Sequence, residues 1–521
     1  MSSATIKSQQ SALEQSLPSI ELLAYAAWFV IVLASVGHAF KTQIIPESLL
    51  RLDAASLTDG MFGYKMDNTF IDWNLYLSMF APMLALLALH LLISRLAMRF
   101  CNAQVHSLLS AIFTLFVSCQ VLSARCTLLY LCLHLICITT ASLLGHLAVW
   151  LSIGLAFWQF SGAAFGDNHQ LRSALQLDSR GAHLYYPVTG YLYCRFLSMG
   201  LCLAASPAFL SDSNPVRRIV RYLPVSLHYA FYLPNFLGAP VVTMDEFLRQ
   251  KQAPNPAAVP VRQILSRLLR LCFWLAFTVF VLHCFHAGAY LETLGIRQIR
   301  HRGPIDPAHL GFALYTRGQL FHLEYLQYYG WPALFASLEG VQLPHWPACI
   351  CGVVSYREMW RLFDRGLFAI VRDHVYIPLG AAGSVWAASC SPPQPPSASS
   401  AFIMATMTQC RSGYCSIWGS SALNCWLSDS TELRSGNLCP ACLRRLVAAF
   451  AAANLIPPSM GIFFLFYGTP IGWLVMREML WLPLTGQGSI KGFLVLYSGF
   501  YCTVQLAFEY KRRRSQALNK D

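Results

Sequence analysis

Charged residues are scarce in this sequence: only 12% of its 521 residues are Asp, Glu, Lys or Arg. Soluble domains carry about 25% charged residues, because charge keeps their surfaces hydrated. Here the hydrophobic fraction is 56% and the mean hydropathy is +0.47. The composition therefore excludes a soluble globule, a disordered chain, a collagen and a coiled coil, and it predicts several membrane crossings.

Acidic residues are the scarcer kind of charge, with 24 Asp and Glu against 37 Lys and Arg and a formal net charge of +13. The basic residues lie between apolar runs and form no stripe with aromatic residues, as a nucleic-acid surface would require. That arrangement is typical of loops beside anionic lipid headgroups, so we expect membrane lipids and no nucleic acid as partners. Most of the 18 cysteines stand singly inside apolar runs and are interpreted as small buried residues.

Long apolar runs are abundant and organise the chain. The first run, 20–40, lacks the basic start and the cleavage site of a signal peptide, so we expect a retained helix. Further runs lie at 75–96, 108–165, 185–209, 265–291, 309–338, 446–468, 471–484 and 492–508. The runs predict an all-α, polytopic transmembrane helix bundle of about ten or eleven membrane elements, some re-entrant, in a single domain over 1–521. The tetrabasic stretch within 510–521 predicts a cytosolic tail.

One charged and aromatic stretch interrupts the apolar pattern, at 355–378, where the sequence reads SYREMWRLFDRGLFAIVRDHVYIP. An ionisable residue at membrane depth costs about 2.5–3.5 kcal/mol to insert, so it is a functional candidate by default. On a helix, Trp360 and Asp364 would share one face, with Arg361 beside them. Asp364 is therefore either a carboxylate paired with a neighbouring arginine or an acid, base or orienting group in a polar cavity.

Four collinear segments resemble one known family. The strongest is MWRLFD at 359–364, followed by VYIPLG at 375–380, which resembles the motif of the membrane-bound O-acyltransferase (MBOAT) family. Within that family, the hedgehog acyltransferase and glycerol uptake protein branch is the most similar. The other segments are FYLPNFLGAP with Phe247 at 231–247, GWPALFASLEG at 330–340, and the loop 59–73.

The resemblance implies transfer of a long-chain fatty acyl group from acyl-coenzyme A, the co-substrate, to an acceptor. The acceptor would be a protein or a lipid of the GPI-anchor type. The resemblance also implies Asp364 as the carboxylate near the thioester, and a separate His as general base on the acceptor. Trp360, Arg361, Tyr356 and His374 are the candidate substrate-binding residues around it. The implied location is the endoplasmic reticulum membrane, with the Golgi as the alternative.

The general base that the resemblance implies is missing from the sequence. The family carries it in a WHG or WHD run after the aspartate, but no His follows His374. Residues 381–442 are instead rich in Pro, Ser and Cys, and 401–408 reads AFIMATMT. The codons from Phe402 onward, read from the third base of the Phe codon, permit His or Tyr, then His, Asn or Tyr, then an obligatory Gly. We therefore hypothesise that 381–442 are translated out of frame, the alternative being a divergent loop, with His374 as the nearest substitute base.

Two further sets of residues have metal or modification chemistry. Cys349 precedes the motif where the resembled branch carries a Cys near the cytosolic interface, which suggests reversible S-acylation, a haem ligand or a small buried residue. His283 and His286 have the spacing of metal ligands on one helix face. No third ligand stands in register with them, so we expect hydrogen bonding within the bundle and no metal.

Two alternatives to an active acyltransferase stay open. A catalytically inactive relative that binds acyl chains or scaffolds partners is favoured by the missing His. A small-solute (glycerol) transporter is suggested by the name of the resembled branch. Transporters tend to show inverted repeats with paired broken helices, whereas this sequence has no visible repeat and one strongly broken segment, Pro234–Pro240.

Overall fold

The chain folds into a bundle of helices, several of which are long enough to cross a membrane. The computed structural model describes residues 17–44, 56–157, 159, 169–252, 259–300, 305–377, 440–488 and 490–518. Within this part of the chain, 8 helices have the length and apolar composition of membrane spans. They occur in α2 (Ser19–Ala39), α4 (Ile71–Phe100), α5 (Ala103–Val121), α6 (Ala124–Leu143), α9 (Ser179–Ala205), α14 (Val261–Cys284), α22 (Pro440–Met476) and α24 (Ile490–Leu518). The predicted all-α polytopic bundle is confirmed.

The other helices are shorter or less apolar. They are α7 (His146–Phe157), α8 (His169–Ala174), α10 (Pro207–Leu210), α11 (Pro215–Ala230), α12 (Leu233–Phe236), α13 (Met244–Gln252), α15 (Ala287–Arg300), α16 (Pro307–Leu338), α17 (Tyr356–Phe363), α18 (Arg365–Val371) and α23 (Leu482–Leu484). Single turns of 3-10 or π helix are η1 (Phe40–Ile44), η2 (Met61–Gly63), η5 (Ile350–Gly352), η6 (Arg372–Tyr376) and η9 (Arg477–Trp481). The predicted number of ten or eleven membrane elements stays a prediction. α16 has 32 residues but contains Arg317 and Glu324, and it is not among the 8 apolar spans.

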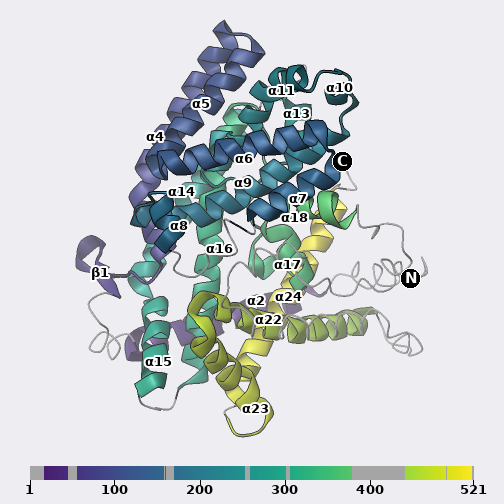
Figure 1. Ribbon diagram of the computed structural model, residues 1–521. Helices are drawn as coiled ribbons and strands as arrows, with labels where there is room; N and C mark the ends of the chain where they lie inside the picture. Colours follow the sequence, from purple (N-terminus) through teal and green to yellow (C-terminus); the bar gives the residue numbers. More distant parts are fainter. Residues whose placement is uncertain are drawn as a thin grey trace.

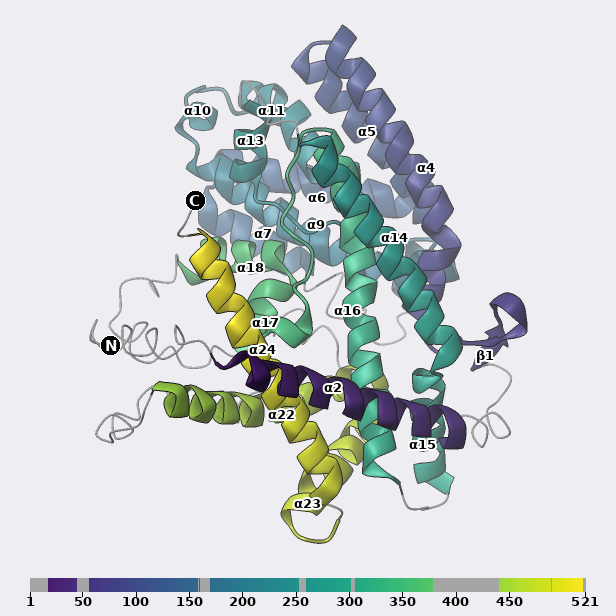
Figure 2. The ribbon, with the colours of Figure 1, turned by 180° about the vertical axis from the view of Figure 1, so that it is seen from behind.

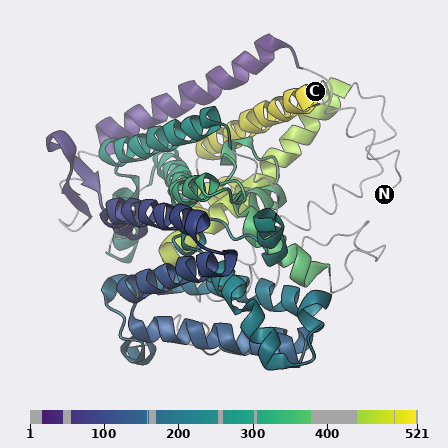
Figure 3. The same ribbon diagram turned by 90° about the horizontal axis from the view of Figure 1, so that it is seen from above.

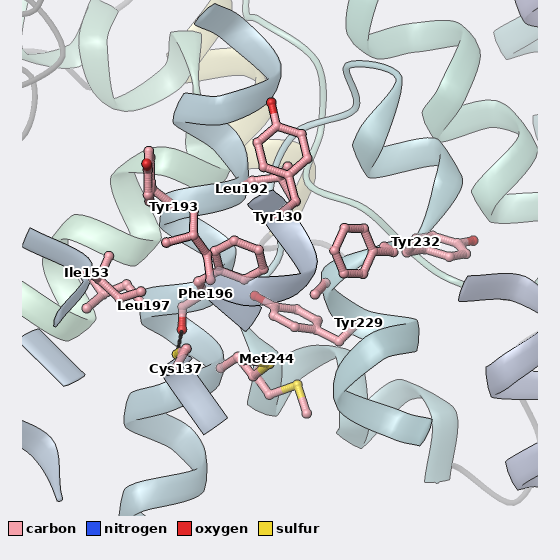
Figure 4. Close-up of a cluster of buried hydrophobic side chains, with 14 of the residues drawn as sticks. Tyr130, Cys137, Ile153, Leu192, Tyr193, Phe196, Leu197, Tyr229, Tyr232 and Met244 are labelled. Atoms are coloured by element: carbon pink, nitrogen blue, oxygen red, sulfur yellow. Dashed lines mark hydrogen bonds between the residues drawn. The ribbon is translucent and has the colours of Figure 1, made fainter. Parts of the chain in front are cut away.

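The largest buried cluster lies where α6, α7, α9 and α11 meet (Figure 4). Tyr130 and Cys137 extend into it from α6, and Phe196 extends into it from α9. The Cys137 thiol donates a hydrogen bond to the Phe196 carbonyl at 3.0 Å. Burial of aromatic side chains contributes strongly to such a core, because each removes a large apolar area from water. The cluster thereby fixes α9, which supplies one wall of the candidate site.

α16 connects this cluster to the rest of the bundle. It runs through the middle of the molecule in both side views and contacts α2, α4, α14, α15 and α24 (Figures 1 and 2). Seen from above, purple α2 and yellow α24 lie on one side and the blue helices α6 and α7 on the opposite side (Figure 3). Glu21 on α2 accepts two hydrogen bonds from Arg445 on α22, at 2.6 and 2.9 Å. The early and late helices of the chain are therefore joined.

The predicted break at Pro234–Pro240 is present. α11 ends at Ala230, α12 is a single turn, and the chain then continues without regular structure to α13. The backbone there is buried and needs internal partners: Asn235 Nδ2 donates to the Pro240 carbonyl at 2.7 Å, and Tyr229 Oη donates to the Val242 carbonyl at 2.8 Å. Non-helical backbone is sheltered by protein at this point, as predicted.

A small hairpin precedes α4 and was not predicted from the sequence. β1 (Leu57–Asp59) and β2 (Lys65–Asp67) pair antiparallel, and the hairpin projects from the bundle beside α15 (Figures 1 and 2). His283 Nε2 accepts the Met61 N–H at 2.9 Å, and His286 Nε2 lies 3.0 Å from the Lys65 carbonyl oxygen. α14 ends between the two histidines, so the prediction that they share one helix face is wrong. Both imidazoles instead hold the hairpin.

Candidate functional site

Asp364 lies at a break between two short helices. α17 ends at Phe363 and α18 begins at Arg365, while Asp364 has φ −125° and ψ 89°. Its Oδ1 accepts the Leu367 N–H at 2.9 Å, so Asp364 is the N-cap of α18. Trp360 and Asp364 therefore do not lie on one continuous helix face, and that prediction is wrong. The sequence pattern suggested an unbroken helix because an N-cap side chain in the middle of a helical run gives no separate signal.

Two tyrosine hydroxyls hold the second oxygen of this carboxyl. Tyr191 on α9 and Tyr329 on α16 each donate to Asp364 Oδ2 at 2.8 Å, and the two hydroxyls also contact each other. Each such bond contributes about 1 kcal/mol, and leaving a buried partner unsatisfied costs more. Asp364 is only 8% exposed. Its side chain is hydrogen-bonded to residues of three helices, α9, α16 and α18.

Both tyrosines were missed in the sequence analysis. Tyr329 follows Phe321 and Tyr325 at four-residue intervals, so the three rings lie along one face of α16. Phe363 stacks on Phe321 with centroids 5.5 Å apart and contacts Tyr325 at 4.9 Å. This aromatic row was the available signal for Tyr329. Tyr191 gave no signal, because its contact with Asp364 joins positions 173 residues apart.

Close packing of α18 against the broken segment requires glycine at position 366. A Cβ atom there would stand 2.0 Å from the Val241 carbonyl oxygen and 2.8 Å from its nitrogen. Both neighbours are backbone atoms, which cannot rotate away as a side chain can. Gly366 therefore lets α18 approach closely enough for Asp364 to meet Tyr191.

We expect Gly366→Ala to lower the thermal unfolding midpoint of the detergent-solubilised protein clearly, because overpacking of this kind costs about 1–3 kcal/mol. Gly318→Ala is the matched control, since Gly318 also lies in a helix but has no heavy atom within 4 Å of the added Cβ. That change should leave the midpoint unchanged or raise it slightly. Equal midpoints for the two variants would contradict the close approach of α18 to Val241.

The candidate residue His374 lies at the far end of the Asp364 segment, on η6. Its Nε2 is 3.1 Å from Ser198 Oγ on α9, and Ser198 Oγ also accepts the Met244 N–H at 3.0 Å. Burial lowers the pKa of His374, so its imidazole is neutral near pH 7 and can accept a proton. Asp364 and His374 are thus both held against α9, two turns of that helix apart.

The remaining predicted substrate-binding residues are distributed around the break. The Trp360 ring contacts the Phe363 ring edge-to-face at 6.4 Å, and Arg361 is exposed. Tyr356 begins α17, and its side chain lies outside the described residues. The roles of all three in substrate binding stay predictions. The segment 381–442, for which we hypothesise a change of reading frame, lies almost wholly outside the described residues as well.

The basic end of α24 supports α17. Lys511 Nζ lies 2.5 Å from both carboxylate oxygens of Glu358, and Glu358 in turn accepts the Val354 N–H at 3.1 Å. Both ion-pair partners are partly buried, which shields the pair from solvent. The residues predicted as a basic cytosolic tail at 510–521 belong, as far as Leu518, to the continuous helix α24, whose Lys511 pairs with Glu358 on α17.

Cys349 stands beside Cys351 in a short turn before α17. Cys349 is exposed, and a hydrogen bond from the Cys351 thiol lowers its pKa to about 6, although partial burial opposes the shift. The Cys351 sulfur also accepts from Gln319 Nε2 at 3.3 Å. This paired, exposed thiol gives no support to the predicted haem ligand, while S-acylation stays a prediction. Among the described residues, no group of three or more His, Cys, Asp or Glu could hold a metal ion.

The Cys349 thiol is expected to be the fastest-reacting cysteine toward iodoacetamide, and its rate should rise steeply between about pH 5 and 7. The reason is that only the thiolate attacks, and the lowered pKa places thiolate formation in that range. Mass spectrometry of the alkylated peptide measures the rate. In Cys351→Ala, which removes the donor, the midpoint should move to higher pH, and a Cys349 midpoint near pH 8.5 in the parent protein, as for an ordinary thiol, would contradict the hydrogen bond.

The eight apolar helices of the described residues, together with a nearly buried carboxyl group at a helix break, define a multi-pass helical membrane protein with a polar centre. No family model matches the chain. The protein-cysteine N-palmitoyltransferase HHAT of Mus musculus is 27% identical to it over 327 residues, which is 59% of this chain and 62% of that protein. The protein-cysteine N-palmitoyltransferase Rasp of Drosophila melanogaster is 27% identical over 164 residues, 31% of each chain. These homologues confirm the predicted resemblance to the hedgehog acyltransferase branch of the MBOAT family.

In both comparisons the aligned region spans less than two thirds of the relative. The names of both relatives describe a palmitoyl group placed on the nitrogen of a protein cysteine. They support a membrane acyltransferase class for this chain.

Proposed function

We propose that this protein transfers a long-chain acyl group from acyl-coenzyme A to the amino group of a protein acceptor. The observation that carries the proposal is Asp364, a nearly buried carboxyl fixed by two tyrosine hydroxyls and by the start of α18. It lies inside the segment that resembles the acyltransferase motif. The palmitoyltransferase activity in the names of both relatives supports the same class of reaction.

The proposed chemistry needs a dry, preorganised polar centre inside the bundle. The acceptor nitrogen attacks the thioester carbonyl carbon, a C–N bond forms, and the C–S bond breaks. The nitrogen loses one proton to a base, and the departing coenzyme A thiolate takes up a proton. Asp364 orients the reacting groups, and its fixed hydrogen bonds keep it from turning as charge develops, which makes the electrostatic contribution effective.

The reaction needs a base that accepts the proton of the acceptor nitrogen. His374 is neutral, and its Nε2 lies 3.1 Å from Ser198 Oγ on α9. The hypothesised frame across residues 381–442 would supply the His that the resemblance implies. A catalytically inactive relative is the second candidate function, favoured by one specific observation, the absence of any His after His374 in the sequence.

The acceptor is proposed to be a protein with a free amino terminus. An N-terminal cysteine offers the nitrogen named in both relatives, whereas a lyso-lipid offers a hydroxyl. We place the protein in the endoplasmic reticulum membrane, with the basic end of α24 toward the cytosol by the positive-inside rule. Acyl-coenzyme A would then enter from the basic face, and the acceptor from the opposite face.

Microsomes from cells that express the full chain test this proposal with an alkyne-labelled palmitoyl-coenzyme A. The acceptor is a synthetic peptide with a free N-terminal cysteine, and the matched control is the same peptide with an acetylated N-terminus. Transfer to the free peptide alone supports the proposed acceptor. Label found only in lipids would replace it with a lipid acceptor, no transfer in any fraction would favour the inactive relative, and glycerol uptake without transfer would favour a transporter.

A further inference from the structure

Three polar side chains lie along one side of α9, and two of them contact the segment that carries Asp364 and His374. Tyr191, Arg195 and Ser198 stand four and three residues apart, which places them along one side of the helix. Tyr191 donates to Asp364, and Ser198 contacts His374. α18, which joins those two residues, packs on α9. The residue between the two contacts on α9 is Arg195.

Arg195 is a buried cation that has no ion-pair partner among the described residues. The residue is 1% exposed, and its Nε and Nη1 atoms have no hydrogen-bond partner among the described residues. Arg195 lies one helical turn beyond Tyr191, the residue that donates to Asp364. A buried charge without a partner is strongly unfavourable. Unsatisfied donors in such a place indicate an anionic group that binds beside them.

We propose that Arg195 is an anion-binding catalytic residue that holds the thioester carbonyl oxygen of acyl-coenzyme A as this oxygen becomes an oxyanion. The identity of the ligand, a thioester, rests on the proposed acyltransferase function. The presence of an anion-binding site at Arg195 does not depend on that function. Arg195 lies between the helix positions that fix Asp364 and His374, which is where a thioester held between those two residues would present its oxygen. A guanidinium suits the task because it is always charged and donates from several nitrogens.

The step assigned to Arg195 keeps atoms and charge balanced. When the acceptor nitrogen forms the C–N bond, the carbonyl π electrons move to oxygen, and the oxyanion accepts hydrogen bonds from Arg195. When the C=O bond re-forms, the C–S bond breaks and its electron pair leaves with the coenzyme A sulfur. The proton lost by the acceptor nitrogen passes to the base and then to that sulfur. Donors at an oxyanion accelerate acyl transfer by about 100- to 1,000-fold each.

The thermal unfolding midpoint of the full chain in detergent gives the first test, and it needs no activity. Arg195→Met keeps the side-chain length and removes the charge, so the midpoint should rise. Arg444→Met is the matched control, because Arg444 is 0% exposed but lies 3.4 Å from its ion-pair partner Glu509. That variant should show a lower midpoint. A lower midpoint for Arg195→Met as well would mean that the chain itself neutralises Arg195, and it would overturn the proposal.

Ligand probes give the second test and separate two sources of an anion. Hexadecane sulfonate combines a long apolar chain with charged oxygens, and it should raise the midpoint of the parent protein. The rise should be lost in Arg195→Met and partly kept in Arg195→Lys. Coenzyme A without an acyl chain is the comparison. An Arg195-dependent rise with coenzyme A alone would assign the site to phosphate, and no rise with the sulfonate would exclude an anion site; either result overturns the proposal.

Kinetics in a chain that transfers palmitate give the third test. Arg195→Met should lower kcat about 100- to 1,000-fold and leave the KM for palmitoyl-coenzyme A nearly unchanged, because the contact forms only as the oxyanion develops. A purely structural residue would not produce this separation, and an unchanged kcat would overturn the assignment. If the parent shows no transfer, the proposed function fails, while the two stability measurements still decide whether Arg195 binds an anion.

Discussion

Microsomes carrying a chain translated from the shifted frame across 381–442 are expected to transfer palmitate about 100- to 10,000-fold faster than microsomes carrying the printed sequence. That range is the usual contribution of a positioned general base. In the shifted frame, the third base of the Ile403 codon and the first two bases of the Met404 codon permit His immediately before an obligatory Gly. The change would therefore restore an imidazole where the resemblance implies one, without altering Asp364 or its partners.

The measurement combines transcript sequencing with the peptide assay. The matched control is the shifted-frame chain in which the restored His is replaced by Ala, which should return to the rate of the printed sequence. A transcript that encodes Phe402, Ile403 and Met404 without a shift would reject the frame hypothesis. Equal rates for the shifted-frame chain and its Ala control would show that this His is not the base.

Replacing Asp364 with Ala is expected to reduce transfer by about 100-fold or more in any chain that is active, since a fixed polar group at the reacting centre contributes on that scale. The same change should lower the unfolding midpoint. It removes the N-cap of α18, which is worth about 0.5–2 kcal/mol, and it leaves the hydroxyls of Tyr191 and Tyr329 without their acceptor.

Asp364→Asn separates these two effects. Asparagine is an equally good N-cap, and its amide N–H groups can donate to the tyrosine oxygens, so this variant should unfold closer to the temperature of the parent protein than Asp364→Ala does. Its transfer rate should still fall, because one amide cannot reproduce a carboxyl group that accepts from both tyrosines and from Leu367. Parent-level transfer in Asp364→Ala would show that Asp364 has no part in the reaction.

The membrane bundle and Asp364 could be predicted from the sequence because both leave local signals. Apolar runs of membrane length are visible without knowledge of the fold, and a carboxyl between aromatic residues is conspicuous within them. The break at Asp364 could not be predicted in the same way. The break depends on the Asp364 side chain, which accepts the Leu367 N–H, and on the close approach of Gly366 to Val241. The second contact joins parts of the chain that are far apart in sequence.

The partners of Asp364 were also beyond sequence analysis for a physical reason. Tyr191 and Tyr329 reach it from two long helices, and which face of each helix turns inward is decided by packing across the bundle. The same holds for His283 and His286, whose spacing suggested one helix face. Because α14 ends between them, they hold a hairpin that itself gave no sequence signal.

The ion pair between Lys511 and Glu358 has a consequence for biosynthesis. α17 leaves the ribosome long before α24, so the residues around Asp364 enter the membrane without the cation that later pairs with Glu358. Until α24 inserts, Glu358 on the short helix α17 lacks the Lys511 cation. A ribosome that stops before Lys511 would thus release a chain in which Glu358 lacks this cation, and which chaperones and proteases can distinguish from a finished one.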